Sequence, residues 1–184
     1  MQRRTALATL GLLLAGASAA APVTPPEYVA RALPGARLAG QGEFRWLLLS
    51  IYHAQLWVGP AGYRSQAPDG APYLLELRYA RDLEGKRIAQ ASVEQMAHVG
   101  VGSSAQRQAW LERMRSAFPD VRRNDTLAGL YLPGQGVRFY LNGALLVEFA
   151  DAEFAQAFFA IWLSPRTSAS ALRSALLQDA AAPP

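Results

Sequence analysis

The chain has 184 residues, 51% of them hydrophobic, and a formal net charge of +4. This length and composition suffice for one domain with one substantial core. The absence of cysteine excludes disulfides, thiol catalysis and thiolate metal sites, and the lack of a basic run with interleaved aromatic residues argues against nucleic acid as a partner.

The first 21 residues have the pattern of a secretory signal peptide. Arg3 and Arg4 give a positive start, residues 6–15 are uncharged and apolar, and Ala17-Ser18-Ala19 has the small-x-small pattern of a cleavage site. A membrane-spanning helix needs about twenty apolar residues, so this run is too short. We therefore predict that residues 1–21 are removed on export and that the mature protein is periplasmic, without a transmembrane span. The arginine pair leaves the general and the twin-arginine route both open.

The first strands follow a segment that carries few structural signals. Residues 22–42 are rich in proline, alanine and glycine, and a short helix or strand is expected near residues 28–33. Alternation predicts one long strand over residues 44–58, which Gly59-Pro60 ends. A loop follows, and residues 73–80 are predicted to form a second strand with Tyr79 and Arg78 on opposite faces.

Two helices and a β-β-β-α-α tail complete the predicted order. Apolar spacings of three and four predict helices over residues 83–99 and 108–118, the second preceded by Ser103-Ser104 as a cap. Three strands follow Asp125, the last two joined by the hairpin dipeptide Asn142-Gly143, and Asp151 begins a helix. The fold class is α+β, a largely antiparallel sheet with a helical layer on one face. The domain is predicted to cover residues 22–179, with a flexible tail at 180–184.

No pattern of catalysis or metal binding is present in the sequence. His53 and His98 lie 45 positions apart, and neither has a carboxylate at ligand spacing. Gly40-Gln41-Gly42 precedes a strand, whereas a dinucleotide-binding loop follows one. Asp151 and Glu153 fit a helix cap and a first helical turn better than acid–base catalysis. We therefore predict no metal, no cofactor and no catalytic residue.

Polar side chains on the first two strands are the candidates for a binding site. Arg45 and Tyr52 belong to the first strand, and Arg78 and Tyr79 to the second. An arginine in an apolar cavity needs an anionic partner, because an unpaired guanidinium is costly at low dielectric. Arg78 has an equally good interpretation as the partner of Glu76 on a solvated face, and both interpretations stay open.

Several segments together resemble the chalcone isomerase-like family. The resemblance extends over residues 40–177 and is carried by Ile51–Trp57, Leu75–Asp82, Phe118–Asp120, the hairpins of residues 129–143 and Phe154–Thr167. It implies an open-faced β-sandwich in which helices cover a large curved sheet, with a ligand cleft between them. The family contains enzymes and also fatty-acid carriers that do no chemistry.

The resemblance argues against chalcone cyclisation. The plant enzymes carry tyrosine, lysine and asparagine on the helix after the second strand, and the matching places here hold Ile88, Ala91 and Gln95. Isoleucine and alanine cannot stabilise a phenolate or orient a water molecule. Tyr52 replaces the strand threonine of those enzymes, whereas their late Ser-Pro-x-Thr is retained and ends in Thr167.

The carriers of the family grip a fatty-acid carboxylate with an arginine and a tyrosine. Tyr52 matches that tyrosine, Arg45 is the nearest candidate arginine, and Arg78 is the substitute. On an unbroken strand positions 45 and 52 face opposite sides, so Arg45 requires a bulge or a strand that starts after it. With Tyr79 and Thr167, these residues are the predicted ligand-binding set.

The sequence therefore predicts an exported protein that binds a small amphipathic ligand, such as a fatty acid, without cyclising chalcones. Two alternatives stay open. One is an isomerase or intramolecular lyase with an unknown substrate, and the other is a periplasmic interaction protein whose cleft is filled by its own side chains. A deep apolar cleft ending in arginine favours the carrier, a polar cleft the enzyme, and no cleft the interaction protein. The oligomeric state is not predicted.

Overall fold

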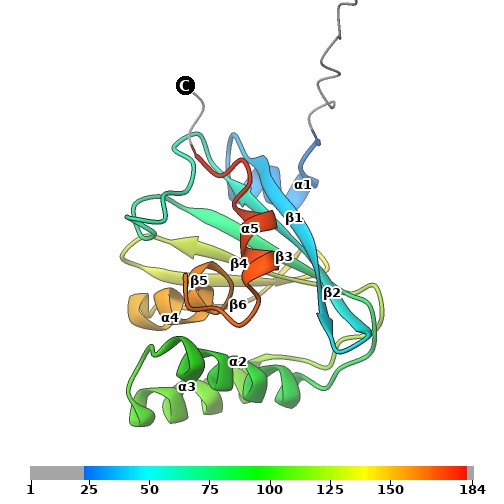
Figure 1. Ribbon diagram of the computed structural model, residues 1–184, viewed down its shortest axis with the longest axis vertical. Coiled ribbons are helices and arrows are strands. Elements are labelled where there is room, and N and C mark those ends of the chain that lie inside the picture. The colour runs from blue at the N-terminus through cyan, green and yellow to red at the C-terminus, as the bar shows by residue number, and fades with distance from the viewer. Residues whose placement is uncertain (1–22, 182–184) are drawn as a thin grey trace, which may run out of the picture.

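The computed structural model describes residues 23–181, which form a six-stranded sheet and five helices (Figure 1). Every strand is antiparallel to the next, and the strands lie side by side in chain order: β1 (Arg37–Trp46), β2 (Leu49–Val58), β3 (Tyr73–Tyr79), β4 (Thr126–Leu132), β5 (Gly136–Leu141) and β6 (Ala144–Phe149). The predicted signal peptide, residues 1–21, lies outside the described residues, as do residues 182–184.

Helices cover the two faces of the sheet unequally (Figure 1). The main core lies between one face and a layer formed by α2 (Gly85–Val99), α3 (Ser104–Ala117), α4 (Ala152–Leu163) and α5 (Ser170–Leu176). Within this layer, α4 packs on β4 and β5, α5 packs on β1, and α2 contacts both α3 and α4. On the other face, α1 (Glu27–Ala32) covers a smaller cluster around Trp57, Leu74 and Leu130. The predicted α+β architecture is confirmed.

The helix ends form where the sequence signals place them. The Ser103 hydroxyl accepts the N–H of Gln106 at 3.2 Å, and the Gln106 side chain accepts the N–H of Ser103 at 2.8 Å, so a capping box begins α3. The Asp151 carboxylate accepts the N–H of Phe154 at 2.9 Å and begins α4. Gly100, with a φ of 76°, ends α2 in the left-handed conformation.

The predicted single strand over residues 44–58 is wrong. The chain reverses at a two-residue turn, Leu47-Leu48, and Trp46 pairs with Leu49 across the β1–β2 hairpin. Such a turn normally begins with glycine or asparagine because its first residue has a positive φ, and Leu47 has a φ of 56°. Since no turn residue marks the reversal, the alternation of side chains continues through it.

Two glycines of β1 allow α5 to lie directly against the strand. A Cβ atom on Gly40 would overlap the carbonyl of Ala175, and one on Gly42 would lie 2.9 Å from Cδ1 of Leu172. A side chain at either position would therefore push the helix away. The Gly40-Gln41-Gly42 sequence thus has a packing role on β1.

We predict that Gly40→Ala lowers the free energy of unfolding by about 1–3 kcal/mol, because the added methyl group forces α5 off β1. Denaturant unfolding followed by circular dichroism measures the change. Gly59→Ala is the matched control, since a Cβ atom there would meet Cδ1 of Leu33 at an ordinary contact distance of 3.5 Å. Equal stability of Gly40→Ala and the wild type would contradict this packing.

Candidate ligand-binding site

Three aromatic side chains lie next to one another across the first three strands, and we call them the aromatic row. Phe44 of β1 pairs with Tyr52 of β2, which pairs in turn with Tyr79 of β3. Directly opposed residues share a face of the sheet. The Phe44 and Tyr52 rings are stacked with centroids 5.1 Å apart, and the Tyr52 and Tyr79 rings meet edge to face at 6.1 Å. The row belongs to the face that the helical layer covers.

The last turn of α4 contacts the aromatic row through Trp162. Its indole N–H donates a hydrogen bond of 2.9 Å to the Tyr52 hydroxyl. The Trp162 ring also packs on Phe158, one turn earlier in α4, with centroids 5.3 Å apart. Trp162 and Tyr79 are buried, whereas Tyr52 is half-buried. Tyr52 is therefore the least buried of these three residues.

The bond to Trp162 determines what the Tyr52 hydroxyl can still do. An indole N–H can only donate, so the phenol oxygen accepts and its own hydrogen stays available for another partner. Burial raises the pKa of Tyr52 well above its ordinary value, and the Trp162 hydrogen bond opposes this only in part. Burial likewise raises the pKa of Tyr79, with a smaller contribution from Tyr52. At neutral pH, Tyr52 is thus a protonated donor surrounded by aromatic rings.

Arg45 lies at the rim of the site. The pairing register shifts between Phe44 and Arg45, so that Arg45 lies opposite Ser50 of β2. The exposed guanidinium forms an ion pair with Glu43, with Nε and Oε2 3.6 Å apart. Glu43 precedes Phe44 on the strand and so faces away from Tyr52. The structure thus places Arg45 beside the aromatic row, and its charge is directed outward.

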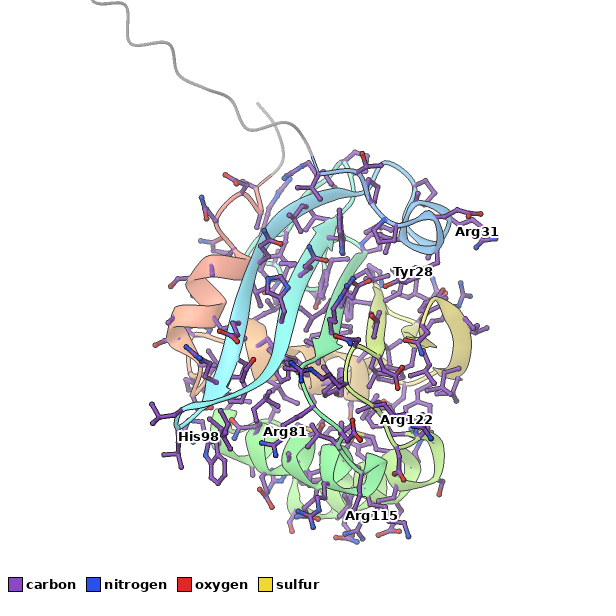
Figure 2. All side chains as sticks on the ribbon, turned by 90° about the vertical axis from the view of Figure 1, so that its right-hand side faces the viewer. Tyr28, Arg31, Arg81, His98, Arg115 and Arg122 are labelled. Carbon is purple, nitrogen blue, oxygen red and sulfur yellow. The ribbon has the colours of Figure 1, made fainter. Side chains whose placement is uncertain are left out.

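Arg78 lies on the opposite face of the sheet from the aromatic row. It is exposed, and in the antiparallel pairing of β2 and β3 it lies opposite His53. Arg78 and Tyr79 are neighbours on β3, so their side chains project from opposite faces of the sheet. Tyr79 shares a face with Tyr52, and the sheet therefore separates Arg78 from Tyr52. Glu76 is buried and accepts a hydrogen bond from the hydroxyl of Tyr28 in α1, which lies against this face in Figure 2. Arg78 is therefore not brought together with Tyr52.

Thr167 is buried in the connection between α4 and α5. Its hydroxyl donates to the carbonyl of Ile161 at 2.6 Å and accepts the N–H of Ala169 at 3.2 Å. Both bonds hold the main chain of this connection. Since its hydrogen is used within the chain, the hydroxyl has none to donate to a ligand.

The α2 positions that match the polar residues of the plant enzymes contain no acid or base. Ile88 packs against the main core, and Ala91 is exposed. The Gln95 side chain accepts a hydrogen bond from the Ser168 hydroxyl at 2.7 Å. None of these three side chains is titratable, so these positions supply no group for proton transfer.

Two residues of the site, Phe44 and Trp162, are absent from the predicted ligand-binding set. Phe44 falls opposite Tyr52 only once the turn is placed at Leu47-Leu48, and the sequence contains no signal for that turn. Trp162 belongs to an apolar stripe on α4 that is typical of a core helix. The retained Ser-Pro-x-Thr segment directly after it is the signal that points to this end of α4.

Two open grooves lie on the surface away from the aromatic row. One, of about 630 Å³, runs between α3 and β6 and includes Arg113 and Phe149. The other, of about 320 Å³, lies between α3 and α4 and includes Trp110. Within residues 23–181, no cluster of three or more histidine, aspartate or glutamate side chains could hold a metal ion. In the same part of the chain, no helix has the length and hydrophobicity needed to cross a membrane.

We predict that alkaline pH destabilises the protein through its buried tyrosines. Burial raises the pKa of Tyr28, Tyr52 and Tyr79 above the ordinary value of 10.0. The folded state therefore holds these protons more tightly than the unfolded state, so their stabilisation is complete below about pH 10 and declines above it. Unfolding measured against pH, together with tyrosinate absorbance, tests this. Ionisation of all seven tyrosines near pH 10 in a folded protein would contradict it.

Comparisons with known proteins agree with this fold. Residues 31–178 match the model of the chalcone isomerase-like family. An uncharacterized protein of Haemophilus influenzae is 31% identical over 138 residues, which cover 75% of this chain and 66% of that protein, so the chain spans about two thirds of its length. The crystal structure of a fatty-acid binding protein from Arabidopsis thaliana has a TM-score of 0.59 and 15% identity, covering 80% of this chain and 89% of that chain, a likeness of fold. The chain belongs to the chalcone isomerase-like family.

Proposed function

We propose that the protein binds a small amphipathic carboxylate, such as a fatty acid, between the β1–β2 hairpin and α4. The Tyr52 hydroxyl is the observation that carries this proposal, because Trp162 occupies its acceptor side and leaves a protonated donor. A carboxylate is a strong acceptor for such a donor. Family membership and the fold shared with a protein named as a fatty-acid binding protein support the proposal.

Aromatic rings supply the apolar surroundings for the ligand chain. Each buried methylene contributes about 0.8 kcal/mol, so about ten contribute about 8 kcal/mol before the cost of association. Phe44, Tyr79 and Trp162 already contact Tyr52 in the described structure. An entering chain must therefore displace part of this packing, and binding requires movement of Trp162 relative to the aromatic row.

Arg45 is the arginine that we propose to join Tyr52 on the carboxylate. Its exposed ion pair with Glu43 is worth at most about 1 kcal/mol, so exchanging partners costs little. Arg45 also directly follows Phe44, at a bulge near the end of the edge strand β1, where its side chain can turn inward. Arg78 has no such route, since it projects from a central strand on the other face.

We predict that the wild-type protein binds a long-chain fatty acid at micromolar concentration. Arg45→Met retains the apolar stem but removes a charge-assisted hydrogen bond, and it should weaken binding by about 1.5–3 kcal/mol, tenfold or more. Tyr52→Phe removes one neutral donor and should cost about 1 kcal/mol. Calorimetry, or displacement of a fluorescent fatty acid, measures all three proteins.

Arg78→Met is the matched control for that experiment, because it removes the same charge from the opposite face of the sheet. Its affinity should equal that of the wild type. Two results would exclude the proposal: no binding by the wild type, or equal losses in the Arg45 and Arg78 variants.

A second candidate function is that of an interaction protein whose cleft is filled by its own side chains. One observation favours it, namely that Trp162 bonds Tyr52 and that the rings of Phe44 and Phe158 pack on these two residues. Absence of fatty-acid binding by the folded wild-type protein would select this candidate over the carrier.

We also propose that the protein works in the periplasm after removal of residues 1–21. The support is the charged start, the apolar run and the Ala17-Ser18-Ala19 pattern. The intact mass of protein recovered from the periplasm is expected to correspond to a chain that begins near Pro22. Recovery of exported protein that still begins with Met1 would contradict the cleavage.

A further inference from the structure

Four consecutive apolar residues are exposed at the end of the β1–β2 hairpin, and we call them the apolar tip. The exposed fractions are 64% for Trp46, 80% for Leu47, 91% for Leu48 and 51% for Leu49. Single exposed apolar residues are common on proteins, but a continuous exposed run of this kind marks a contact surface. The turn end of the hairpin lies at the edge of the molecule (Figure 1), so the tip is convex and accessible.

The backbone of the apolar tip gives a second reason to assign it a role. Leu47 has a φ of 56°, a conformation that is unfavourable for leucine and that glycine or asparagine adopts readily. At 80% exposure, Leu47 gains little packing that would offset this cost. Local propensity would favour a turn residue at this position, so the strained leucine supports a role for its apolar surface.

Basic side chains lie at the same end of the sheet as the apolar tip (Figure 2). Arg45 directly precedes it. The start of β2 lies beside the end of β3, where the N–H of Ala80 donates to the carbonyl of Ile51 at 2.9 Å, and the exposed Arg81 follows Ala80. Figure 2 shows Arg81 and Arg122 along the end of the sheet at which the hairpin turns. Glu43 and Asp82 lie nearby, the first paired with Arg45 and the second accepting the N–H of Arg123 at 2.8 Å.

We propose that the apolar tip inserts into the surface of a phospholipid bilayer that contains anionic headgroups. Tryptophan and leucine with arginine behind them form the combination that partitions into a bilayer interface, the apolar side chains below the headgroups and the cations at their level. A protein partner would present a complementary groove, and a convex tip whose one polar side-chain group is the Trp46 indole N–H offers such a partner little specificity. The proposal does not rest on fatty-acid binding.

Cosedimentation with phosphatidylcholine vesicles, with and without phosphatidylglycerol, tests this contact. The wild type should bind vesicles that contain phosphatidylglycerol, and added salt should weaken binding because it screens the arginines. The variant Leu47→Asn/Leu48→Ser should bind about tenfold more weakly or worse, since two leucine side chains no longer leave water. Asparagine tolerates a positive φ, so the hairpin turn is maintained.

Leu145→Ser is the matched control, because Leu145 is 61% exposed on β6, at the opposite edge of the sheet. It should bind vesicles like the wild type, whereas Arg81→Gln should bind more weakly and with less dependence on salt.

The proposal is overturned if the wild type does not bind vesicles, or if the tip variant binds as tightly as the wild type. It is also overturned if sedimentation shows a wild-type dimer that the tip substitutions convert to a monomer without any effect on vesicles. If the protein binds fatty acids but not vesicles, the membrane proposal fails and the fatty-acid proposal is unaffected.

Discussion

The packing of α4 on the sheet is the interaction on which the rest of the structure depends. Phe159 meets Tyr73 of β3 and Tyr131 of β4 edge to face, with centroids 5.0 and 5.7 Å apart. Gly129 of β4 leaves room for this ring, since a Cβ atom there would lie 3.1 Å from it. Phe158 packs on Phe139 of β5 at 5.0 Å. One helix thus joins three strands, and Trp162, in its last turn, extends the contact to Tyr52 on β2.

Both ends of α4 are held by polar contacts, which determines where Trp162 lies. At the start, Asp151 caps the helix and also accepts hydrogen bonds from Arg113 at 2.8 Å and Trp110 at 3.3 Å, both on α3. At the end, Thr167 bonds back to the carbonyl of Ile161. The direction of the Tyr52 hydroxyl is therefore a consequence of the whole α4 packing.

Much of the fold could be predicted from the sequence because local signals and burial agree there. Asn142-Gly143, with φ values of 49° and 83°, forms the turn between β5 and β6 as expected. The β1–β2 hairpin could not be predicted, because its turn consists of two leucines and contradicts local propensity. The candidate site could likewise be predicted only in part. The sequence predicts Tyr52 and Tyr79, but the pairing with Phe44 depends on a register that only the hairpin turn defines.

The indole N–H signals of the four tryptophans offer the most direct test of the proposed site, because each reports on a different part of the molecule. Nuclear magnetic resonance during a fatty-acid titration follows all four signals at once. The account predicts that the signal of Trp162 shifts as its bond to Tyr52 changes, while Trp57, on the α1 face, and Trp110, bonded to Asp151, stay unchanged. If a saturating fatty acid leaves the Trp162 signal in place, the ligand does not bind at the aromatic row and the central claim is wrong.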